Sequence, residues 1–359
     1  MPLPFFKSRV KKREDVIAID LGGRHTKAVH VRNMGGRLTL VNFAVHDSPS
    51  EDTATPSVEV LAEHLKSVTK ALGDGTKTVV VALGVADTVV RRTEMPPMPM
   101  DDLRQLLRFN TKNYLQQDLP DHVFDCSVVL ARMTDGATPA EAPKAAPGQK
   151  QQLIVGAGKR QIVEDVASAI REAGLTAAQI VPGLIGPVNA FELSEPEIFA
   201  HEAVALVDLG FRNTTIAILQ RGELVMHRVV HLGGDRLTHG LAETMGISYA
   251  EAEGIKVGMP TEVQAALEPL VGGLGRELRA FLDFFEHQQD VPVSQVFVSG
   301  GSARGELLVQ ALQLELMVPC RTWNPAKSFD MTLSPELAAE FAVASPQLAV
   351  AVGAALSAL

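Results

Sequence analysis

The sequence has little cysteine, few aromatic residues and fewer basic than acidic side chains. Its two cysteines, Cys126 and Cys320, lie in one predicted strand and near the end of another. They indicate neither a metal cluster nor a disulfide framework, and we expect buried thiols of a reducing compartment. With a net charge of −9 and 5% aromatic residues, the chain lacks the basic, stacking surface of a general nucleic-acid-binding protein.

The sequence contains no apolar run that approaches the length of a membrane span, so we expect no membrane-spanning segment. Residues Met1–Arg13 place their charges after a very short apolar stretch, unlike a secretory signal. Phe5, Phe6 and the basic cluster after them are compatible with contact to an anionic membrane surface, but we favour a solvated tail. A chain of 359 residues with 46% hydrophobic content is long enough for two or three globular subdomains.

An aspartate, two glycines and a lysine follow the first apolar run. Val16–Ile19 are β-branched or small and predict a buried strand that ends at Asp20. Gly22 and Gly23 permit a turn in which backbone N–H groups approach an anion, and Lys27 adds positive charge. A strand follows rather than a helix, unlike dinucleotide-binding or Walker loops. By itself this segment fits a phosphate loop and a plain hairpin turn equally well.

The same pattern recurs in the second half of the chain. Ala203–Leu219 gives an apolar strand, Asp208-Leu-Gly210, a polar turn with Asn213 and Thr214, and another strand, before Glu223–Val230 adds a third. The spacing is that of a domain rather than of a solenoid repeat. Two such β-meanders indicate an internal duplication with a nucleotide held between the halves.

Three further motifs follow the second meander, and they carry a resemblance. Together with the two Asp-Leu-Gly hairpins, these motifs occur along the chain in the same order as in proteins of the actin-like ATPase superfamily. The chain resembles that superfamily over nearly its whole length. The motifs are Gly233-Gly-Asp235, Ala252-Glu-Gly-Ile-Lys256 and Val296-Phe-Val-Ser-Gly-Gly-Ser302.

More narrowly, the chain resembles the PilM family, FtsA-related proteins of type IV pilus assembly. The narrower resemblance rests on the middle of the chain: Met95-Pro-Pro-Met-Pro99, a predicted helix from Asp101 to Gln117, Phe124–Leu130, Leu153–Lys159 and Ala173-Gly-Leu175.

Some of these motifs have a simpler interpretation from their residues alone. Gly233 and Gly234 fit a plain turn before a helix as well as a phosphate contact at the helix N-terminus. Glu253 and Lys256 are three residues apart on one helix face, where a surface ion pair is the default. The resemblance implies instead that Glu253 and Lys256 lie by the ribose and base of a nucleotide.

The resemblance implies an α/β protein with the actin-like ATPase fold: two duplicated halves around a nucleotide cleft, with an inserted subdomain similar to subdomain 1C of FtsA. We assign residues 14–85, 178–200 and 340–359 to the first half and 201–339 to the second. The insert is 86–177, with a flexible loop at 131–150. Crossing helices at 183–192 and 346–358 are expected to pack together, so that the halves can hinge about them.

Residues typical of helix ends predict where several helices begin and end. Thr55 is predicted to be the N-cap of a helix, and Pro56 its first helical residue. We expect one continuous helix over 101–117 and another over 303–316. A long helix over 262–287 is expected to be interrupted at Gly272-Gly273, where the chain should bend, because two glycines weaken a helix interior.

ATP with Mg²⁺ is the cofactor that the resemblance implies. Asp20 and Asp208 are expected to hold the cation through water, as hard oxygen ligands that offset phosphate charge. The nucleotide-binding candidates in this sequence are Asp20, Gly22, Gly23, Arg24, Lys27, Asp208, Gly210, Asn213, Thr214, Gly233, Gly234, Asp235, Glu253, Lys256, Gly300, Gly301 and Ser302.

The function implied is that of a cytoplasmic, ATP-binding adaptor at the inner-membrane face of a pilus or secretion machine. It would dock the N-terminal cytoplasmic peptide of a PilN-like membrane protein, with other pilus inner-membrane components as further partners and mainly indirect membrane contact. A small-molecule kinase and an FtsA- or MreB-like filament former stay open as alternatives.

No side chain stands out as a catalytic base. Arg24 and His25, with Phe211 and Arg212 in the second loop, are bulky where PilM relatives carry small residues. We therefore expect a weak ATPase or a protein that binds ATP without hydrolysing it.

Overall fold

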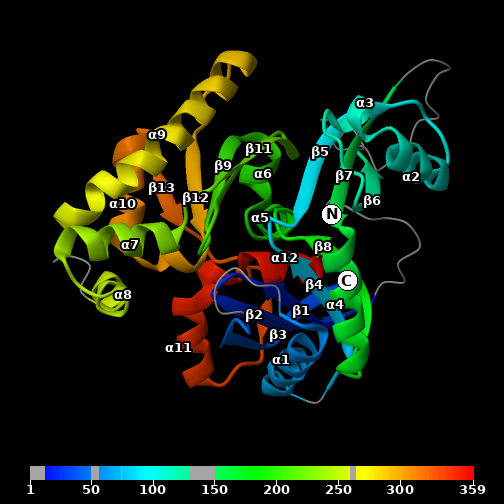
Figure 1. Ribbon diagram of the computed structural model, residues 1–359, viewed down its shortest axis with the longest axis horizontal. Helices are drawn as coiled ribbons and strands as arrows, with labels where there is room; N and C mark the ends of the chain where they lie inside the picture. The colour runs from blue at the N-terminus through cyan, green and yellow to red at the C-terminus, as the bar shows by residue number, and fades with distance from the viewer. Residues whose placement is uncertain (1–12, 50–55, 74, 130–149, 259–263) are drawn as a thin grey trace.

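The computed structural model describes residues 13–49, 56–73, 75–129, 150–258 and 264–359, so the predicted N-terminal tail and the 131–150 loop lie largely outside it. The described residues form three β-sheets (Figure 1). The first runs β14-β3-β2-β1-β4-β8 and the second β11-β10-β9-β12-β13, while a smaller sheet runs β5-β7-β6.

The strands of the first sheet are β1 (Asp15–Leu21), β2 (His25–Met34), β3 (Arg37–Asp47), β4 (Thr78–Leu83), β8 (Thr176–Pro182) and β14 (Asp330–Met331). Those of the second are β9 (Ala203–Leu209), β10 (Thr214–Gln220), β11 (Glu223–Val230), β12 (Gln295–Ser299) and β13 (Cys320–Thr322). The small sheet contains β5 (Thr88–Met95), β6 (His122–Val128) and β7 (Gln151–Lys159).

The two large sheets repeat one arrangement. In each, a hairpin follows the first strand, and a later strand pairs parallel to that first strand on its other side. Asp20 lies opposite Lys27 in the first hairpin, and Asp208 lies opposite Thr215 in the second. The duplicated β-meanders predicted from the sequence are therefore present, with an aspartate near the end of each first strand.

Helices cover both faces of the first sheet. α1 (Val58–Ala71) and α4 (Arg160–Glu172) pack together on one face, where Leu65, Val68 and Ile170 are fully buried. The amphipathic spacing of apolar residues in both helices accounts for this placement. α5 (Ile185–Ser194) and α12 (Ala349–Ala358) lie on the other face, between the two halves.

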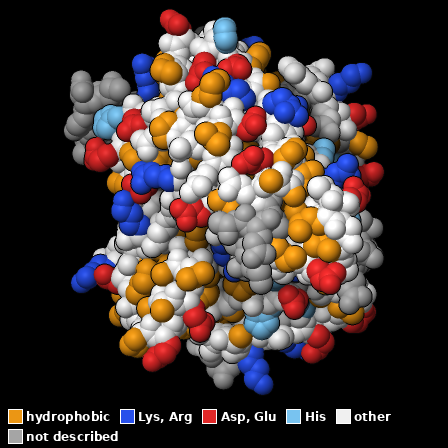
Figure 2. All heavy atoms as spheres, turned by 90° about the vertical axis from the view of Figure 1, so that its left-hand side faces the viewer, with side chains coloured by type: hydrophobic (Ala, Val, Ile, Leu, Met, Phe, Trp, Pro, Cys, Tyr) orange, Lys and Arg blue, Asp and Glu red, His pale blue; other side chains and the backbone are white. Residues whose placement is uncertain are grey.

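The helices of the second half are α7 (Gly234–Met245), α8 (Tyr249–Gly258), α9 (Gln264–Gln289) and α10 (Glu306–Leu316). The remaining helices outside the small sheet are α6 (Pro196–His201), of six residues, and α11 (Pro335–Ala344), of ten. α9 and α10 pack on the second sheet around a core that includes Leu278, Leu282, Phe285 and Leu312. Side chains of both signs are interspersed with hydrophobic ones on the face that Figure 2 shows.

The two crossing helices meet as the small residues of their sequences predict. α5 and α12 approach so closely that a Cβ at Gly186 would lie 2.5 Å from the Val350 carbonyl oxygen. A Cβ at Gly353 would collide with the Gly186 carbonyl. Glycine is required at this contact because two backbones occupy the space of a side chain.

The small sheet has a core of its own and two short helices, α2 (Met100–Phe109) and α3 (Thr111–Leu115). The prediction of one helix over 101–117 was wrong, because Asn110 leaves the helical region at φ −134° and ψ 36°. Its backbone N–H still donates to the Leu106 carbonyl oxygen at 3.0 Å, and its side-chain Nδ2 donates to the same oxygen at 3.4 Å, so both bonds close the end of α2. Although α4 lies inside 86–177, it packs in the core of the first half, and the extent of the insert stays a prediction.

Three other helix predictions need correction. The cap of α1 is Ser57, whose Oγ accepts from the Val60 amide at 3.4 Å; Thr55 is outside the described residues. The 303–316 segment divides into a 3₁₀ turn, η2 (Gly301–Arg304), and α10, with Gly305 between them. α9 continues through Gly272 and Gly273 without a break, since Gly272 packs beside Glu315 of α10.

One helical segment among the described residues, Pro335–Ala358, is long and apolar enough for a membrane span by length and composition. The expectation that no apolar run has this length was wrong. The segment comprises α11, the 3₁₀ turn η3 (Ser345–Leu348) and α12, and 78% of its most apolar stretch is buried inside the protein. Packing against the first sheet and α5 accounts for its composition, so the segment is weak evidence for a membrane span.

Both thiols are expected to react slowly. Burial raises the pKa of Cys126 to about 11 and that of Cys320 to about 12, so the reactive thiolate is scarce at neutral pH. Native protein treated with Ellman's reagent at pH 8 should release far less than one equivalent of chromophore during a time in which unfolded protein releases two. Rapid stoichiometric reaction of either cysteine in the native protein would contradict this prediction.

Candidate functional site

A cavity of about 710 Å³ lies between the two halves. The turns β1–β2 and β9–β10 meet there, and α7, α8 and the turn after β12 form the rest of its second-half wall. A volume of this size is within the range of small-molecule sites. The duplication thus places equivalent turns on opposite sides of one cavity.

Most of the residues predicted from the sequence line this cavity. They are Asp20, Gly22, Gly23, Arg24, Lys27, Asp208, Gly210, Asn213, Gly234, Glu253, Lys256, Gly300, Gly301 and Ser302.

Thr214, Gly233 and Asp235 lie behind the cavity wall instead. The Thr214 hydroxyl is fully buried and donates to the Leu232 carbonyl at 2.6 Å, while the next residue, Thr215, lines the cavity. The position of Gly233 leaves no room for a side chain, since its Cβ would lie 2.7 Å from the Gly210 carbonyl oxygen. Asp235 accepts a hydrogen bond from the Tyr249 hydroxyl at 2.9 Å.

The glycine amides are used differently from the sequence interpretation. The Gly22 N–H donates to the Asp20 carbonyl at 3.0 Å, the Gly210 N–H to the Asp208 carbonyl at 3.2 Å, and the Gly234 N–H to the Gly210 carbonyl at 2.9 Å. These glycines therefore shape the turns rather than offer their amides to an anion. The N–H groups of Gly23 and Phe211 make no backbone hydrogen bond within the part of the chain that the structure describes, and both residues line the cavity.

Two carboxylates stand at the base of the cavity. Asp20 Oδ2 pairs with Lys27 Nζ at 3.1 Å, and Asp208 Oδ1 accepts from the Ser299 hydroxyl at 2.8 Å. Burial raises the pKa of Asp208, while the Ser299 hydrogen bond and the Lys27 charge oppose that rise. Carboxylate oxygens suit a hard divalent cation. No cluster of three or more His, Cys, Asp or Glu exists among the described residues, so a cation here would need water or phosphate as further ligands.

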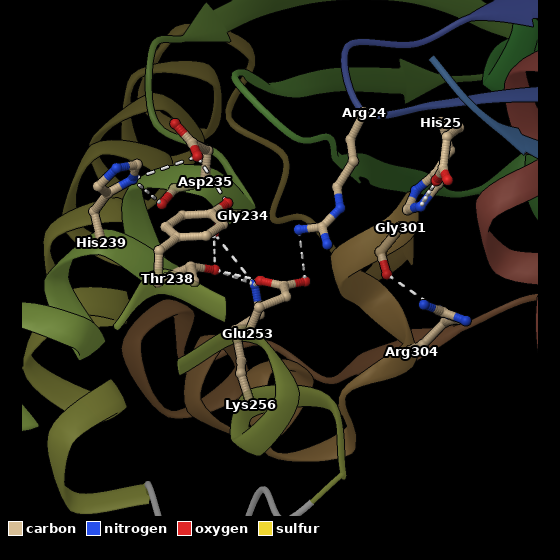
Figure 3. Close-up of polar contacts among 12 residues, drawn as sticks. Arg24, His25, Gly234, Asp235, Thr238, His239, Glu253, Lys256, Gly301 and Arg304 are labelled. Atoms are coloured by element: carbon tan, nitrogen blue, oxygen red, sulfur yellow. Dashed lines mark hydrogen bonds and ion pairs between the residues drawn. The ribbon is translucent and has the colours of Figure 1, made fainter. Parts of the chain in front are cut away.

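A polar network forms the opposite wall (Figure 3). The Glu253 carboxylate pairs with Lys256 Nζ at 2.7 Å and accepts from the Thr238 hydroxyl at 2.5 Å. Burial raises the pKa of Glu253, but the hydrogen bonds from Lys256 and Thr238 and the charge of Lys256 outweigh it and lower the pKa overall. Glu253 and Lys256 thus form the ion pair expected of their spacing, and it faces the cavity rather than bulk solvent.

The sequence reasoning missed other parts of the wall. His25 and Thr26 line the cavity, as does Arg304, two residues after the Gly-Gly-Ser motif. Burial lowers the pKa of His25, and the nearby charges of Arg24 and Lys27 lower it further. Asp87 and Asp165 line the side nearest the insert. The sequence could have pointed to His25, Thr26 and Arg304, because each lies within two residues of a motif residue. No motif on α4 marks Asp165.

A family model described as type IV pilus assembly protein PilM matches residues 18–359. The chain belongs to the PilM family. A solved chain of a PilM–PilN type IV pilus biogenesis complex has a TM-score of 0.81 with it, at 22% identity, covering 97% of this chain and 99% of that one.

Other relatives agree on the fold of this PilM family member. Cell division protein FtsA of Bacillus subtilis is 23% identical over 265 residues, 69% of this chain and 58% of FtsA. The chain thus spans a little over half the length of the FtsA relatives it matches. MreB5 of Spiroplasma citri bound to ADP has a TM-score of 0.52 at 11% identity, covering 96% of each chain. The predicted actin-like ATPase fold and the PilM resemblance are confirmed.

Proposed function

We propose that this PilM family member binds Mg-ATP between its two halves and docks the N-terminal cytoplasmic peptide of a PilN-like inner-membrane protein. The observation that carries the nucleotide proposal is the cavity on which both Asp-Leu-Gly turns and the Gly300–Ser302 turn converge. The peptide proposal draws on family membership and on the likeness to a chain from a PilM–PilN complex. Docking would place the protein in the cytoplasm at the inner-membrane face, with mainly indirect membrane contact.

The residues fit a triphosphate with a cation. The Gly23 and Phe211 amides and Lys27 can donate to phosphate oxygens from both turns. Asp20 and Asp208 would hold Mg²⁺ through water, and the cation would neutralise phosphate charge. Glu253 and Lys256 lie where they can meet ribose hydroxyls, and the open space beside Gly301 admits a base. The solved MreB5 bound to ADP supports a nucleotide as the ligand of this fold.

Hydrolysis is expected to be weak or absent. The start of α5 contributes the apolar Leu184 and Pro187 to the cavity wall, and neither can orient or deprotonate an attacking water. Phosphoryl transfer to water needs such a positioning group. We therefore propose a protein that holds ATP as a structural ligand, with any turnover slow.

The insert is the proposed docking element. Its three-stranded sheet and the helices α2 and α3 enclose a core of their own, on which we propose a groove for the peptide. A short extended peptide is recognised by main-chain hydrogen bonds and side-chain pockets in such a groove. We propose residues 86–177 as the extent of this subdomain and the partner peptide as its occupant, with other inner-membrane pilus components as further partners.

One observation favours a small-molecule kinase as a second candidate. The cavity continues past the first turn to Asp87, Lys159 and Asp165, where a carboxylate could serve as the base that the sequence did not reveal. Transfer of labelled phosphate from ATP to a metabolite mixture, lost in Asp165→Asn, would favour the kinase. A filament-forming ATPase would instead sediment with ATP at high speed.

Calorimetric titration with Mg-ATP tests the proposal directly. We expect saturable binding of one nucleotide, because one cavity holds both turns. The ATP-loaded protein is then titrated with synthetic N-terminal peptides of PilN-like membrane proteins, with a scrambled peptide of equal composition as control. Docking of the native peptide alone supports the adaptor. Absence of nucleotide binding at millimolar ATP would reject the nucleotide proposal, and failure of every peptide would reject the docking proposal.

A further inference from the structure

The bulky residues of the two turns, which the proposed function does not need, contact each other across the cleft. The guanidinium carbon of Arg24 lies 5.7 Å from the centroid of the Phe211 ring, a cation–π distance. A Cβ at Gly23 would lie 3.5 Å from the same ring and 3.9 Å from Arg212. The first turn of one half therefore packs directly on the second turn of the other.

An ion pair spans the cavity beside this contact. Arg24 Nη1 lies 3.1 Å from Glu253 Oε1, with side-chain exposures of 36% and 19%. Figure 3 shows the Arg24 side chain extending from its turn toward the Glu253 carboxylate on α8. The other partners of Glu253 among the described residues, Lys256 and Thr238, both belong to the second half. Arg24 thus joins Glu253 to the first half.

We infer that Arg24, Phe211 and Glu253 form a latch that holds the two halves together in the nucleotide-free protein, and that a phosphate releases it by taking the Arg24 guanidinium from Glu253. This inference rests on the proposed nucleotide function for its second part only. The first part concerns the contacts that the structure shows between the two halves.

The exchange follows from the charges present. A guanidinium binds phosphate oxygens as readily as a carboxylate, through two parallel N–H donors. Glu253 keeps Lys256 and Thr238 when Arg24 leaves, so its charge stays paired. One bulky arginine therefore serves two anions in turn. This explains why a side chain too large for a plain phosphate turn stands at position 24.

Hydrogen–deuterium exchange of the nucleotide-free protein tests the latch. Arg24→Ala and, separately, Glu253→Gln should speed amide exchange in peptides covering 209–214 and 249–256 by about two- to fivefold, the scale of one partly exposed ion pair. Combining Arg24→Ala with Glu253→Gln should speed exchange no more than the larger of the two single effects, because both changes remove the same ion pair. Arg228→Ala, which breaks a pair with Glu277 inside the second half, is the matched control and should leave both peptides unchanged.

The outcomes separate the latch from the nucleotide proposal. Unchanged exchange in both single variants, or an effect of the double variant equal to the sum of the two single effects, would overturn the latch. If the single variants exchange faster while wild type binds no Mg-ATP, the latch stands and the nucleotide proposal falls. If wild type binds Mg-ATP, Arg24→Glu should bind it more weakly, because a carboxylate at position 24 repels phosphate; equal affinity would overturn the release step.

Discussion

Replacing both Asp20 and Asp208 by alanine is expected to weaken Mg-ATP binding by at least about a hundredfold. Each carboxylate stands at the end of an equivalent strand, and a group that orients a metal through water typically contributes tenfold to a hundredfold to affinity. The dependence on Mg²⁺ should disappear in the double variant, leaving weak binding of free ATP through Lys27 and the turn amides. Calorimetry with and without Mg²⁺ measures both effects.

Two controls make this result interpretable. Asp125→Ala removes a carboxylate of the insert that pairs with Arg104 at 2.8 Å outside the cavity, and it should retain wild-type affinity. Lys27→Ala should weaken binding less than the double variant, because the backbone donors remain. Circular dichroism and thermal melting must show that the double variant folds. Unchanged Mg-ATP affinity in a folded double variant would refute the assignment of the cation to these aspartates.

The sequence predicts the parts of this fold that depend on neighbouring residues. Each β-meander follows from alternating apolar strands and a polar turn, and Asp20 and Asp208 reach the cavity because strand pairing fixes their positions. Gly246 ends α7 in the left-handed region at φ 65°, as a glycine after an amphipathic run indicates. Local pattern is sufficient where local contacts decide the conformation.

Long-range packing accounts for what the sequence did not reveal. β14 joins the first sheet by pairing with β3, nearly three hundred positions earlier in the chain, and its two residues carry no strand pattern. α4 packs on α1 although the preceding strand belongs to another sheet. α9 stays helical through Gly272 because contact with α10 outweighs the glycine's own preference. None of these contacts leaves a periodic signal.

The candidate site divides in the same way. The motifs identified most of the predicted residues of the cavity wall, because these residues are neighbours in the sequence and lie together in the turns that line the cavity. They misplaced Thr214 by one position, since a strand alternates its faces and only Thr215 points into the cavity. They also credited Gly22 and Gly210 with free amides that the turns themselves use.

Adding a single methyl group where α5 and α12 cross is expected to destabilise the protein more than adding one elsewhere. Gly353→Ala places a Cβ against the Gly186 carbonyl, and the two helices must separate to admit it. Overpacking costs about 1–3 kcal/mol and more where backbone has to move, so we expect about 3 kcal/mol. Chemical denaturation followed by circular dichroism measures the change in the free energy of unfolding.

Gly273→Ala is the matched control for this variant. Gly273 is also a helix-interior glycine, but nothing lies within 4 Å of its Cβ position, so alanine should stabilise the protein by roughly 0.5–1 kcal/mol. Both substitutions gain the same helix propensity, and the difference between them isolates the collision at the crossing. If Gly353→Ala were as stable as Gly273→Ala, the two helices could not be in backbone contact. A hinge about that contact would then lose its structural basis, because only a close, rigid crossing lets two halves rotate without exposing their shared core.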